Sequence, residues 1–166
     1  MRVAVLTISD SVSKGTRKDE SGSAIASWAT SKKYEIAAQA QCADETVEIV
    51  RHLIEWSDSG TTDLILTTGG TGLSPTDVTP EATRAVIDRE AQGIVEFLRL
   101  AEYDAFPKAA LSRAIAGVRN RTLIINLPGS PKAVAQNLRM FPAFLEHACD
   151  VLAGKVKSHD EGVSKK

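Results

Sequence analysis

The sequence predicts an α/β fold: a single three-layer domain in which helices cover both faces of a mostly parallel sheet. Segments with strand character alternate along the chain with segments of helical periodicity, and this order is typical of parallel sheets. The aliphatic run at residues 64–66 ends in turn-forming residues, as a strand buried on both faces does. A chain of 166 residues that is 43% hydrophobic can bury about two thirds of its unfolded surface in one core.

The balance of charge excludes some classes of partner. The chain carries 20 basic and 21 acidic residues, a net charge of −1, and so lacks an overall basic field that would recruit nucleic acid or an anionic membrane. Aromatic residues make up 5% of the sequence, too few for a base-stacking platform. We therefore expect no nucleic-acid partner and no membrane partner.

The cysteines indicate a reducing compartment. Cys42 and Cys149 lie far apart in the sequence and form no C-x-x-C pair, which also argues against a structural zinc site. The apolar run at residues 3–8 is too short for a signal peptide or a membrane span. These features predict a cytoplasmic protein.

Two strands and two helices precede the run at 64–66. The patterns predict strands at residues 3–8 and 34–42, a helix at 24–32, and a helix from residue 46 that stops at 57–60. The polar segment 9–22 predicts a long loop, which in a compact domain is usually functional or mobile. Its Lys14, Arg17 and Lys18 can reach phosphates, although a solvated charged loop is the commoner explanation.

A glycine turn follows the strand at 64–66. Gly69, Gly70 and Gly72 let the backbone adopt positive φ and approach a ligand closely, because no Cβ intervenes. Leu73-Ser74 follows the last glycine, so the Lys-Ser/Thr that a P-loop needs is missing, and so is the G-x-G-x-x-G of a dinucleotide site. The turn is open to two interpretations, a phosphate site or a tight connection only.

The residues after the glycines predict a helix start. Thr79 has the character of an N-cap, Pro80 of the first helical residue, and Glu81 lies in the first turn. Backbone N–H groups at such a start can bind an anion, most plausibly phosphate. Asp77 in this loop would repel phosphate unless a cation such as Mg²⁺ lay between them, while a turn or cap residue is the alternative.

The second half of the chain predicts helices around a hairpin. One helix is expected at 80–89, and Gly93 is expected to separate it from another that ends near residue 101. The strands expected at 114–118 and 122–126 flank the turn-forming residues 119–121.

Residues 127–132 repeat the logic of the glycine turn. An apolar strand leads to Gly129, Ser130 is a hydroxyl N-cap, and Pro131 is the first helical residue. Two such starts favour neighbouring anion sites, and equally two well-capped helices. A final helix is expected at 134–152 with a kink at Pro142, followed by a polar, disordered tail at 155–166.

The candidate polar groups all follow predicted strands. Ser9-Asp10, Asp44, residues 69–77 and Gly129-Ser130 come at carboxyl ends of strands, which meet at one edge of a parallel sheet. No G-x-S-x-G motif is present and no histidine lies near these loops, so covalent catalysis is disfavoured. Metal-assisted phosphate transfer fits better, with carboxylates holding Mg²⁺ and helix starts holding anions.

Several motifs together resemble one known family. They are Ser9-Asp10-Ser11, Gly15, Asp19, Ser21-Gly22, Asp44-Glu45, Thr67-Thr68-Gly69-Gly70-Thr71-Gly72, Asp77-Val78-Thr79-Pro80-Glu81-Ala82, Leu111-Ser112-Arg113 and Leu127-Pro128-Gly129-Ser130-Pro131-Lys132. This combination resembles the MoaB/Mog family of molybdenum cofactor biosynthesis, which includes molybdopterin adenylyltransferases and the G domain of gephyrin. The resemblance covers residues 3–154 and implies a MoaB/Mog-like, molybdopterin-binding domain over residues 1–154.

The resemblance also implies a reaction and its residues. The reaction is transfer of AMP from ATP to the molybdopterin phosphate, with release of pyrophosphate, in a homotrimer with Mg²⁺ and with hand-off to a molybdenum-insertion protein. Asp44 and Asp77 match the family's functional aspartates and are the expected catalytic and metal residues. The expected substrate and nucleotide residues are Ser9, Asp10, Ser21, Gly22, Thr68, Gly69, Gly70, Thr71, Gly72, Thr79, Pro80, Glu81, Ser112, Pro128, Gly129, Ser130 and Lys132.

Three positions depart from the family pattern. Ala43 stands where a proline often precedes the Asp-Glu pair, Thr76 stands where many members have arginine, and Glu102 stands where serine is expected. We expect Ala43 to loosen the Asp44 loop, Thr76 to remove one anion contact, and Glu102 to be unfavourable beside a phosphate unless it points away. The alternative function is a non-catalytic molybdopterin-binding or scaffold module.

Overall fold

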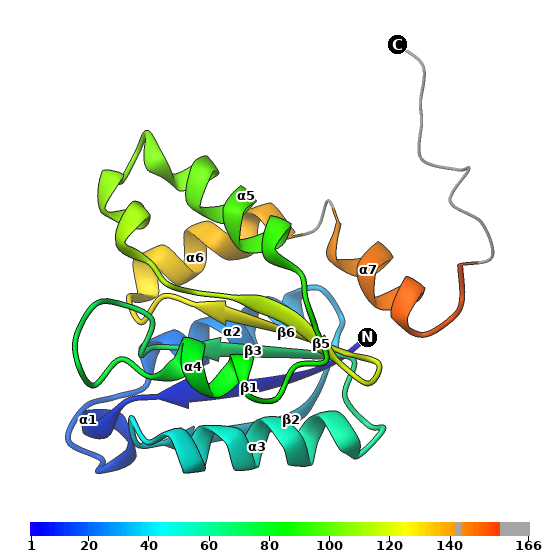
Figure 1. Ribbon diagram of the computed structural model, residues 1–166, viewed down its shortest axis with the longest axis horizontal. Helices are drawn as coiled ribbons and strands as arrows, with labels where there is room; N and C mark the ends of the chain where they lie inside the picture. Colours follow the sequence, from blue (N-terminus) through cyan, green and yellow to red (C-terminus); the bar gives the residue numbers. More distant parts are fainter. Residues whose placement is uncertain (142–143, 157–166) are drawn as a thin grey trace.

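A six-stranded sheet forms the centre of the computed structural model, which describes residues 1–141 and 144–156 (Figure 1). Its strands, in the order β2-β1-β3-β6-β5-β4, are β1 (Arg2–Ile8), β2 (Glu35–Cys42), β3 (Leu64–Thr68), β4 (Arg89–Glu90), β5 (Ala116–Arg119) and β6 (Thr122–Leu127). Strand β1 pairs in parallel with β2 and β3, and β3 with β6, whereas β5 runs antiparallel to β4 and β6. The predicted mostly parallel sheet and the β5–β6 hairpin are confirmed.

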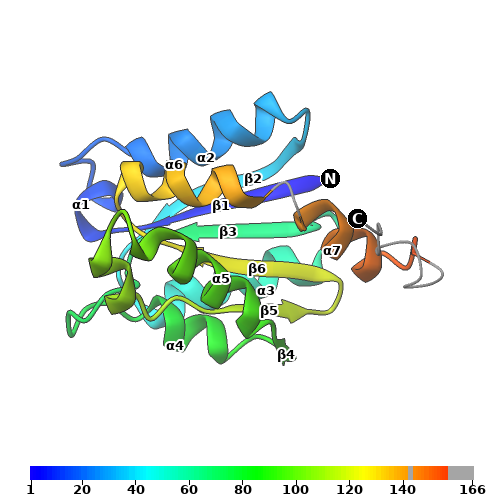
Figure 2. The ribbon, with the colours of Figure 1, turned by 90° about the horizontal axis from the view of Figure 1, so that it is seen from above.

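Helices cover both faces of this sheet. They are α1 (Asp10–Ser13), α2 (Glu20–Ser31), α3 (Thr46–Asp58), α4 (Thr79–Arg84), α5 (Gln92–Tyr103), the 3₁₀ helix η1 (Pro107–Leu111), α6 (Pro131–Met140) and α7 (Leu145–Leu152). Helices α2, α5 and α6 lie over one face, and α3 and α4 over the other (Figures 1 and 2). The three-layer prediction is therefore confirmed.

The side-chain alternation of β1 explains the two layers. Val3 and Val5 are fully buried against α2 and its neighbours, whereas Ala4 and Leu6 are fully buried against α3 and α4. Successive side chains of a strand point to opposite faces, so a strand with apolar side chains on both faces needs helices on both sides. Within residues 1–141 and 144–156, no helix combines the length and the apolar character that crossing a membrane would require.

Segment 9–22, predicted as a loop, is partly helical. Helix α1 lies within it, and α2 begins at Glu20 rather than at residue 24. The carboxylate of Asp19 accepts a hydrogen bond from the backbone N–H of Gly22 at 2.8 Å, which is the bond of an N-cap. The predicted start was wrong because the Asp19 cap begins the helix ahead of residue 24, where the apolar pattern begins.

The helix predicted at 80–89 is present, but its predicted end is wrong. Helix α4 ends at Arg84, and the backbone N–H groups of Asp88 and Ala91 donate at 2.8 Å to carbonyls of the β5 strand. These bonds place β4 at the edge of the sheet. Gly93 does not separate two helices but lies in the first turn of α5.

Two helices, α6 and α7, replace the single final helix of the prediction. The kink predicted at Pro142 lies outside the described residues, as does the predicted tail from residue 157 onward.

Asn126 joins three elements beneath the carboxyl edge of the sheet. Its side-chain N–H₂ donates to Thr67 Oγ1 at 3.0 Å and Thr83 Oγ1 at 2.9 Å, and its Oδ1 accepts from the Ile115 N–H at 3.2 Å. The Asn126 side chain is buried. If it is removed, its hydrogen-bond partners on Thr67, Thr83 and Ile115 cannot pair with water instead.

We expect Asn126→Ala to lower the free energy of unfolding by about 2–4 kcal/mol, because it leaves buried polar partners unpaired. Urea denaturation measures the loss. Thr83→Val supplies the control: in the double variant the two losses should not add, and strict additivity would contradict the network.

Candidate functional site

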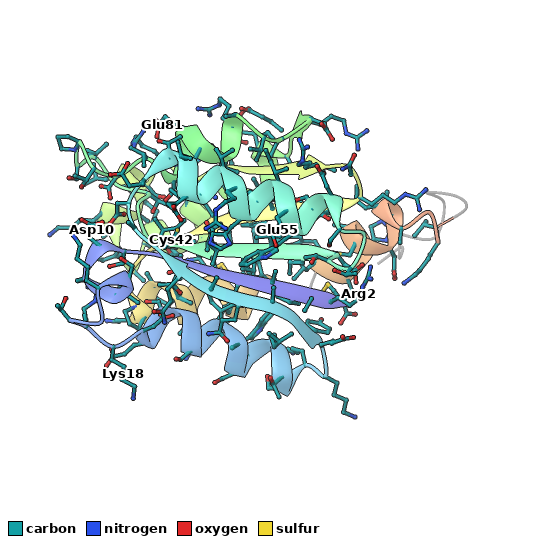
Figure 3. All side chains as sticks on the ribbon, turned by 90° about the horizontal axis from the view of Figure 1, so that it is seen from below. Arg2, Asp10, Lys18, Cys42, Glu55 and Glu81 are labelled. Atoms are coloured by element: carbon teal, nitrogen blue, oxygen red, sulfur yellow. The ribbon has the colours of Figure 1, made fainter. Side chains whose placement is uncertain are left out.

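Two adjoining cavities open at the carboxyl edge of the sheet. The first, of about 680 Å³, is the polar cavity, and the second, of about 390 Å³, is the apolar cavity. Gly70, Asp77, Gly129 and Ser130 line both and so form their common wall. Figure 3 shows Asp10, Lys18 and Glu81 at this end of the molecule and Arg2 at the opposite end.

The loops after β1, β2, β3 and β6 all contribute to the polar cavity. It is lined by Thr7, Ile8, Ser9, Val12, Arg17, Lys18, Asp19, Glu20, Ser21, Asp44, Thr68, Gly69, Gly70, Asp77, Gly129, Ser130 and Pro131. The predicted convergence of the strand ends is thus observed. Arg17 and Lys18 reach this cavity, whereas Lys14 is paired with Asp10 at 3.2 Å instead.

The wall between the cavities is built of touching backbone. Gly69 has φ +101°, and a Cβ added there would lie 2.1 Å from the carbonyl oxygen of Ile8. A Cβ on Gly129 would lie 3.3 Å from the Cα of Gly69. The β3 and β6 loops can approach each other and the end of β1 only because side chains are absent.

Asp44 is held by Asp10 through a reciprocal pair of hydrogen bonds. The Asp10 N–H donates to Asp44 Oδ2 at 2.9 Å, and the Asp44 N–H donates to Asp10 Oδ1 at 3.1 Å. The bond from the Asp44 backbone, helped by Lys14, lowers the pKa of Asp10 below its ordinary value. This pair ties the Asp44 loop to α1, so the loop is anchored even though Ala43 replaces a proline.

Asp77 closes a turn and faces both cavities. Its Oδ2 accepts from the Ser74 N–H at 2.8 Å, and its own N–H donates to the Ser74 carbonyl at 2.9 Å. The interpretation of Asp77 as a turn residue is therefore confirmed, and the residue also lines both cavities. The departure Thr76 contacts Ser74 Oγ at 3.0 Å on the exposed side of the same turn.

Arg113, absent from the predicted site, fixes this loop. Its Nε donates to the Gly72 carbonyl at 2.6 Å, its Nη2 to the Asp77 carbonyl, and its backbone N–H to the Thr71 carbonyl at 2.9 Å. Its Nη1 pairs with the carboxylate of Glu81. Although burial opposes the change, this pairing holds the pKa of Glu81 below its ordinary value.

The two predicted helix starts differ in the structure. Thr79 is not the N-cap of α4 but its first residue, and its buried hydroxyl donates to the Gly69 carbonyl at 2.9 Å. The cap prediction was wrong because it relied on the proline that follows Thr79. The hydroxyl instead stabilises the glycine turn. Ser130 does occupy the N-cap position of α6 and lines both cavities.

Most of the predicted site residues line a cavity. Those on the polar cavity are Ser9, Ser21, Asp44, Thr68 and Gly69; those on the apolar cavity are Thr71, Gly72, Ser112 and Pro128; those on both are Gly70, Asp77, Gly129 and Ser130. The predicted residues that line neither are Asp10, Gly22, Thr79, Pro80, Glu81 and Lys132. Of these, Asp10 and Thr79 contact lining residues and act as braces.

Anchoring bonds connect α2 and β3 to the β6 loop. Ser21 Oγ donates to the Gly129 carbonyl at 2.8 Å, and Thr68 Oγ1 donates to the Pro128 carbonyl at 2.6 Å. Both hydroxyls therefore fix the backbone of the loop that separates the cavities.

The polar cavity offers carboxylates but no closed metal cluster. Among the described residues, no group of three or more His, Cys, Asp and Glu side chains gathers to hold an ion. Asp44 and Asp77 each commit Oδ2 to a backbone N–H, and within residues 1–141 and 144–156 their Oδ1 atoms accept no hydrogen bond. Two carboxylates with free oxygens fit Mg²⁺, which takes one or two protein carboxylates together with water and substrate phosphates.

The apolar cavity contains one buried acid, Glu102, which in the sequence stands out only as a departure from the family pattern. Glu102 of α5 is 6% exposed and lines this cavity with Val95, Leu98, Phe106 and Ala133. Its Oε1 accepts from Asn137 Nδ2 at 2.6 Å. Burial raises the pKa of Glu102 above its ordinary value.

This raised pKa predicts how stability depends on pH. The folded protein binds the Glu102 proton more tightly than the unfolded chain, so stability falls as pH rises from the unfolded pKa to the folded pKa. Glu102→Gln removes the ionisable group and should raise the melting temperature at pH 8, with a gain that disappears near pH 3. Thermal melts at several pH values measure it, and a constant difference across the range would contradict the assignment.

Comparisons with known proteins agree on one family. Residues 4–147 match the model of the probable molybdopterin binding domain. The chain is 38% identical to the molybdopterin adenylyltransferase of Helicobacter pylori over 97% of this chain and 93% of that protein. It is 38% identical to gephyrin of Dictyostelium discoideum over 94% of this chain but only 23% of gephyrin. The crystal structure of the molybdopterin biosynthesis enzyme MoaB from Thermus thermophilus has a TM-score of 0.86 and 46% identity, and the match covers 92% of this chain and 96% of that one.

Proposed function

This chain belongs to the molybdopterin-binding MoaB/Mog family, and on that premise we propose that it is a molybdopterin adenylyltransferase of molybdenum cofactor biosynthesis. It transfers AMP from ATP to the phosphate of molybdopterin and releases pyrophosphate. The observation that carries the proposal is the pair of cavities that meet at Asp77 and the glycine wall, because a two-substrate transfer needs two sites with one common boundary.

The polar cavity suits ATP and the apolar cavity suits the pterin. Arg17 and Lys18 supply positive charge for the phosphates in the polar cavity. Leu98, Phe106 and Ala133 supply apolar contacts for a flat ring in the other. The molybdopterin phosphate then lies at the common wall, beside Gly70 and Ser130.

The reaction is an in-line displacement at phosphorus. An oxygen of the molybdopterin phosphate attacks the α-phosphorus of ATP and forms a new P–O bond. The bond from the α-phosphorus to the oxygen that bridges it to the β-phosphorus breaks, and pyrophosphate leaves with the electron pair. The loops contribute by orienting the two phosphates, which Asp10 and Arg113 support by holding the Asp44 and Asp77 loops.

Mg²⁺ is the cofactor that Asp44 and Asp77 would hold. When bound, it neutralises charge on the phosphates of ATP and of the leaving pyrophosphate. The free Oδ1 atoms of both residues support this assignment. Without such a cation the two carboxylates would repel the phosphates that the cavity is proposed to bind.

The remaining proposals concern assembly and location. Leu100, Tyr103 and Leu111 expose 76%, 51% and 53% of their surface on α5 and η1, an apolar area that a homotrimer would cover. Light scattering of the purified protein tests that state. We place the protein in the cytoplasm, where it would pass its product to a molybdenum-insertion protein.

Pyrophosphate release tests the activity directly. Purified protein mixed with ATP, Mg²⁺ and molybdopterin should release pyrophosphate and form adenylylated molybdopterin, and omission of either substrate should abolish both. The second candidate, a non-catalytic pterin-binding or scaffold module, is favoured by the carboxylate of Glu102 where serine is expected. Tight pterin binding without pyrophosphate release would establish that alternative and refute the enzyme.

A further inference from the structure

The apolar cavity holds a carboxylate that the proposed chemistry does not use. Glu102 lines the apolar cavity but not the polar cavity, and so is not part of the common wall. Among the described residues no salt bridge involves it, although Arg99 and Lys108 also line the cavity. A buried acid without a cation partner destabilises a fold, so its presence calls for a ligand that needs it.

Asn137 orients this carboxylate. The two N–H bonds of its amide are both committed, one to Glu102 Oε1 at 2.6 Å and the other to the Ala133 carbonyl at 2.9 Å. Within the part of the chain that the structure describes, the second carboxylate oxygen, Oε2, accepts no hydrogen bond. The acid is therefore fixed through one oxygen, and the other can accept from a molecule in the cavity.

We propose that Glu102 is the specificity-determining residue that recognises the 2-amino and N3–H edge of the pterin ring. This inference rests on the proposed function, since it assigns the pterin to the apolar cavity. The 2-amino-4-oxopyrimidine edge of a pterin presents two neighbouring N–H donors, and a carboxylate presents the matching pair of acceptors. The ring would then enter with this edge toward Glu102 and with its phosphate-bearing side toward Gly70 and Ser130.

This orientation also resolves the unfavourable charge expected for Glu102. A carboxylate beside the transferred phosphate would repel it, whereas one beside an N–H edge attracts the ring. The carboxylate and the phosphate-binding wall then select the two ends of the same substrate.

Two fluorescent probes and one substitution test the proposal. The probes are 6-hydroxymethylpterin and 6-hydroxymethyllumazine, which differ because the lumazine has a carbonyl oxygen in place of the 2-amino group. The wild-type protein should bind the pterin about tenfold or more tightly than the lumazine, because the lumazine places an acceptor against a carboxylate. In Glu102→Gln the preference should disappear or reverse, since an amide offers one acceptor and one donor, which match the lumazine edge.

Glu96→Gln is the matched control, because Glu96 is an exposed glutamate of the same helix and lines neither cavity. It should keep the wild-type preference. Retention of the wild-type preference in Glu102→Gln, or equal binding of both probes by wild type, would overturn the inference.

Pyrophosphate release by the wild type separates this test from the proposed function. A wild type that releases pyrophosphate but does not discriminate between the probes refutes the role of Glu102 alone. If the wild type prefers the pterin and Glu102→Gln does not, the inference is supported even if no pyrophosphate forms. In that case only the proposed adenylyl transfer is refuted.

Discussion

Asp77→Asn and Asp44→Asn should each lower the rate of pyrophosphate release about 10²- to 10³-fold while molybdopterin binding is retained. Asparagine has nearly the shape of aspartate, so its side-chain carbonyl oxygen can still accept the same hydrogen bond. In Asp77→Asn the donor is the Ser74 N–H, and in Asp44→Asn it is the Asp10 N–H. The loops therefore keep their turns, and what is lost is a negative charge in the polar cavity. A cation held by two carboxylates would lose half of its protein charge in either variant.

The measurement compares turnover with binding in the same preparations. Pyrophosphate release reports turnover, and pterin fluorescence reports binding. Glu45→Gln is the matched control, since Glu45 is the exposed neighbour of Asp44 and makes no capping hydrogen bond among the described residues. Pyrophosphate release that is unchanged in both aspartate variants would refute the catalytic assignment, whereas loss of Mg²⁺-dependent protection against thermal unfolding in both would support it.

The sequence was most informative where a pattern depends on near neighbours. Continuous burial of Leu64, Ile65 and Leu66 follows from a local apolar run. Ser9, Asp44 and Gly129 line one cavity because the carboxyl ends of parallel strands meet at one edge of the sheet. These predictions need only the period of the pattern and the geometry of a parallel sheet. They explain why the fold, and the meeting of the strand ends at one edge of the sheet, could be predicted.

Predictions failed where contacts distant in sequence override local preference. Residues 86–89 were predicted as helical, but Ile87 packs against Gly117, where an added Cβ would lie 2.5 Å from Ile87 Cδ1. The backbone on either side of β4 pairs with β5 instead. Likewise Thr79 serves Gly69, ten residues earlier, rather than its own helix. A single sequence carries no signal for such partners.

The helical side of the apolar cavity was not predicted, for the same reason. Besides the β3 and β6 loops, its lining comes from α5, η1 and α6, three elements that no one motif connects. The Leu111-Ser112-Arg113 motif was visible, but the role of Arg113 was not, because it acts by donating to carbonyls of a loop about 40 residues earlier. On this helical side, Glu102 was noted in the sequence as a departure from the family pattern.

The largest effect on stability is expected from Gly69→Ala. The residue has φ +101°, outside the conformations that alanine adopts readily, and the new Cβ would lie 2.1 Å from the Ile8 carbonyl oxygen. Backbone strain and overpacking together should cost about 2–6 kcal/mol, a large part of the total stability of a domain. The end of β1, which leads into Ser9 and Asp10, would have to move, so the polar cavity would change shape as well.

Alanine substitutions at two other glycines separate backbone strain from overpacking in the stability that Gly69→Ala loses. Gly93, in the first turn of α5, has no atom within 4 Å of an added Cβ, and alanine there should stabilise the protein by about 0.5–1 kcal/mol. Gly60 has φ +70° but equally open space, so Gly60→Ala should show backbone strain alone, about 1 kcal/mol. In urea denaturation, the free energy of unfolding should be highest for Gly93→Ala, lower for Gly60→Ala and lowest for Gly69→Ala. If Gly69→Ala lowered the free energy of unfolding no more than Gly60→Ala did, the end of β1 would be able to move aside. Close contact between the β1 and β3 backbones would then not determine the shape of the site.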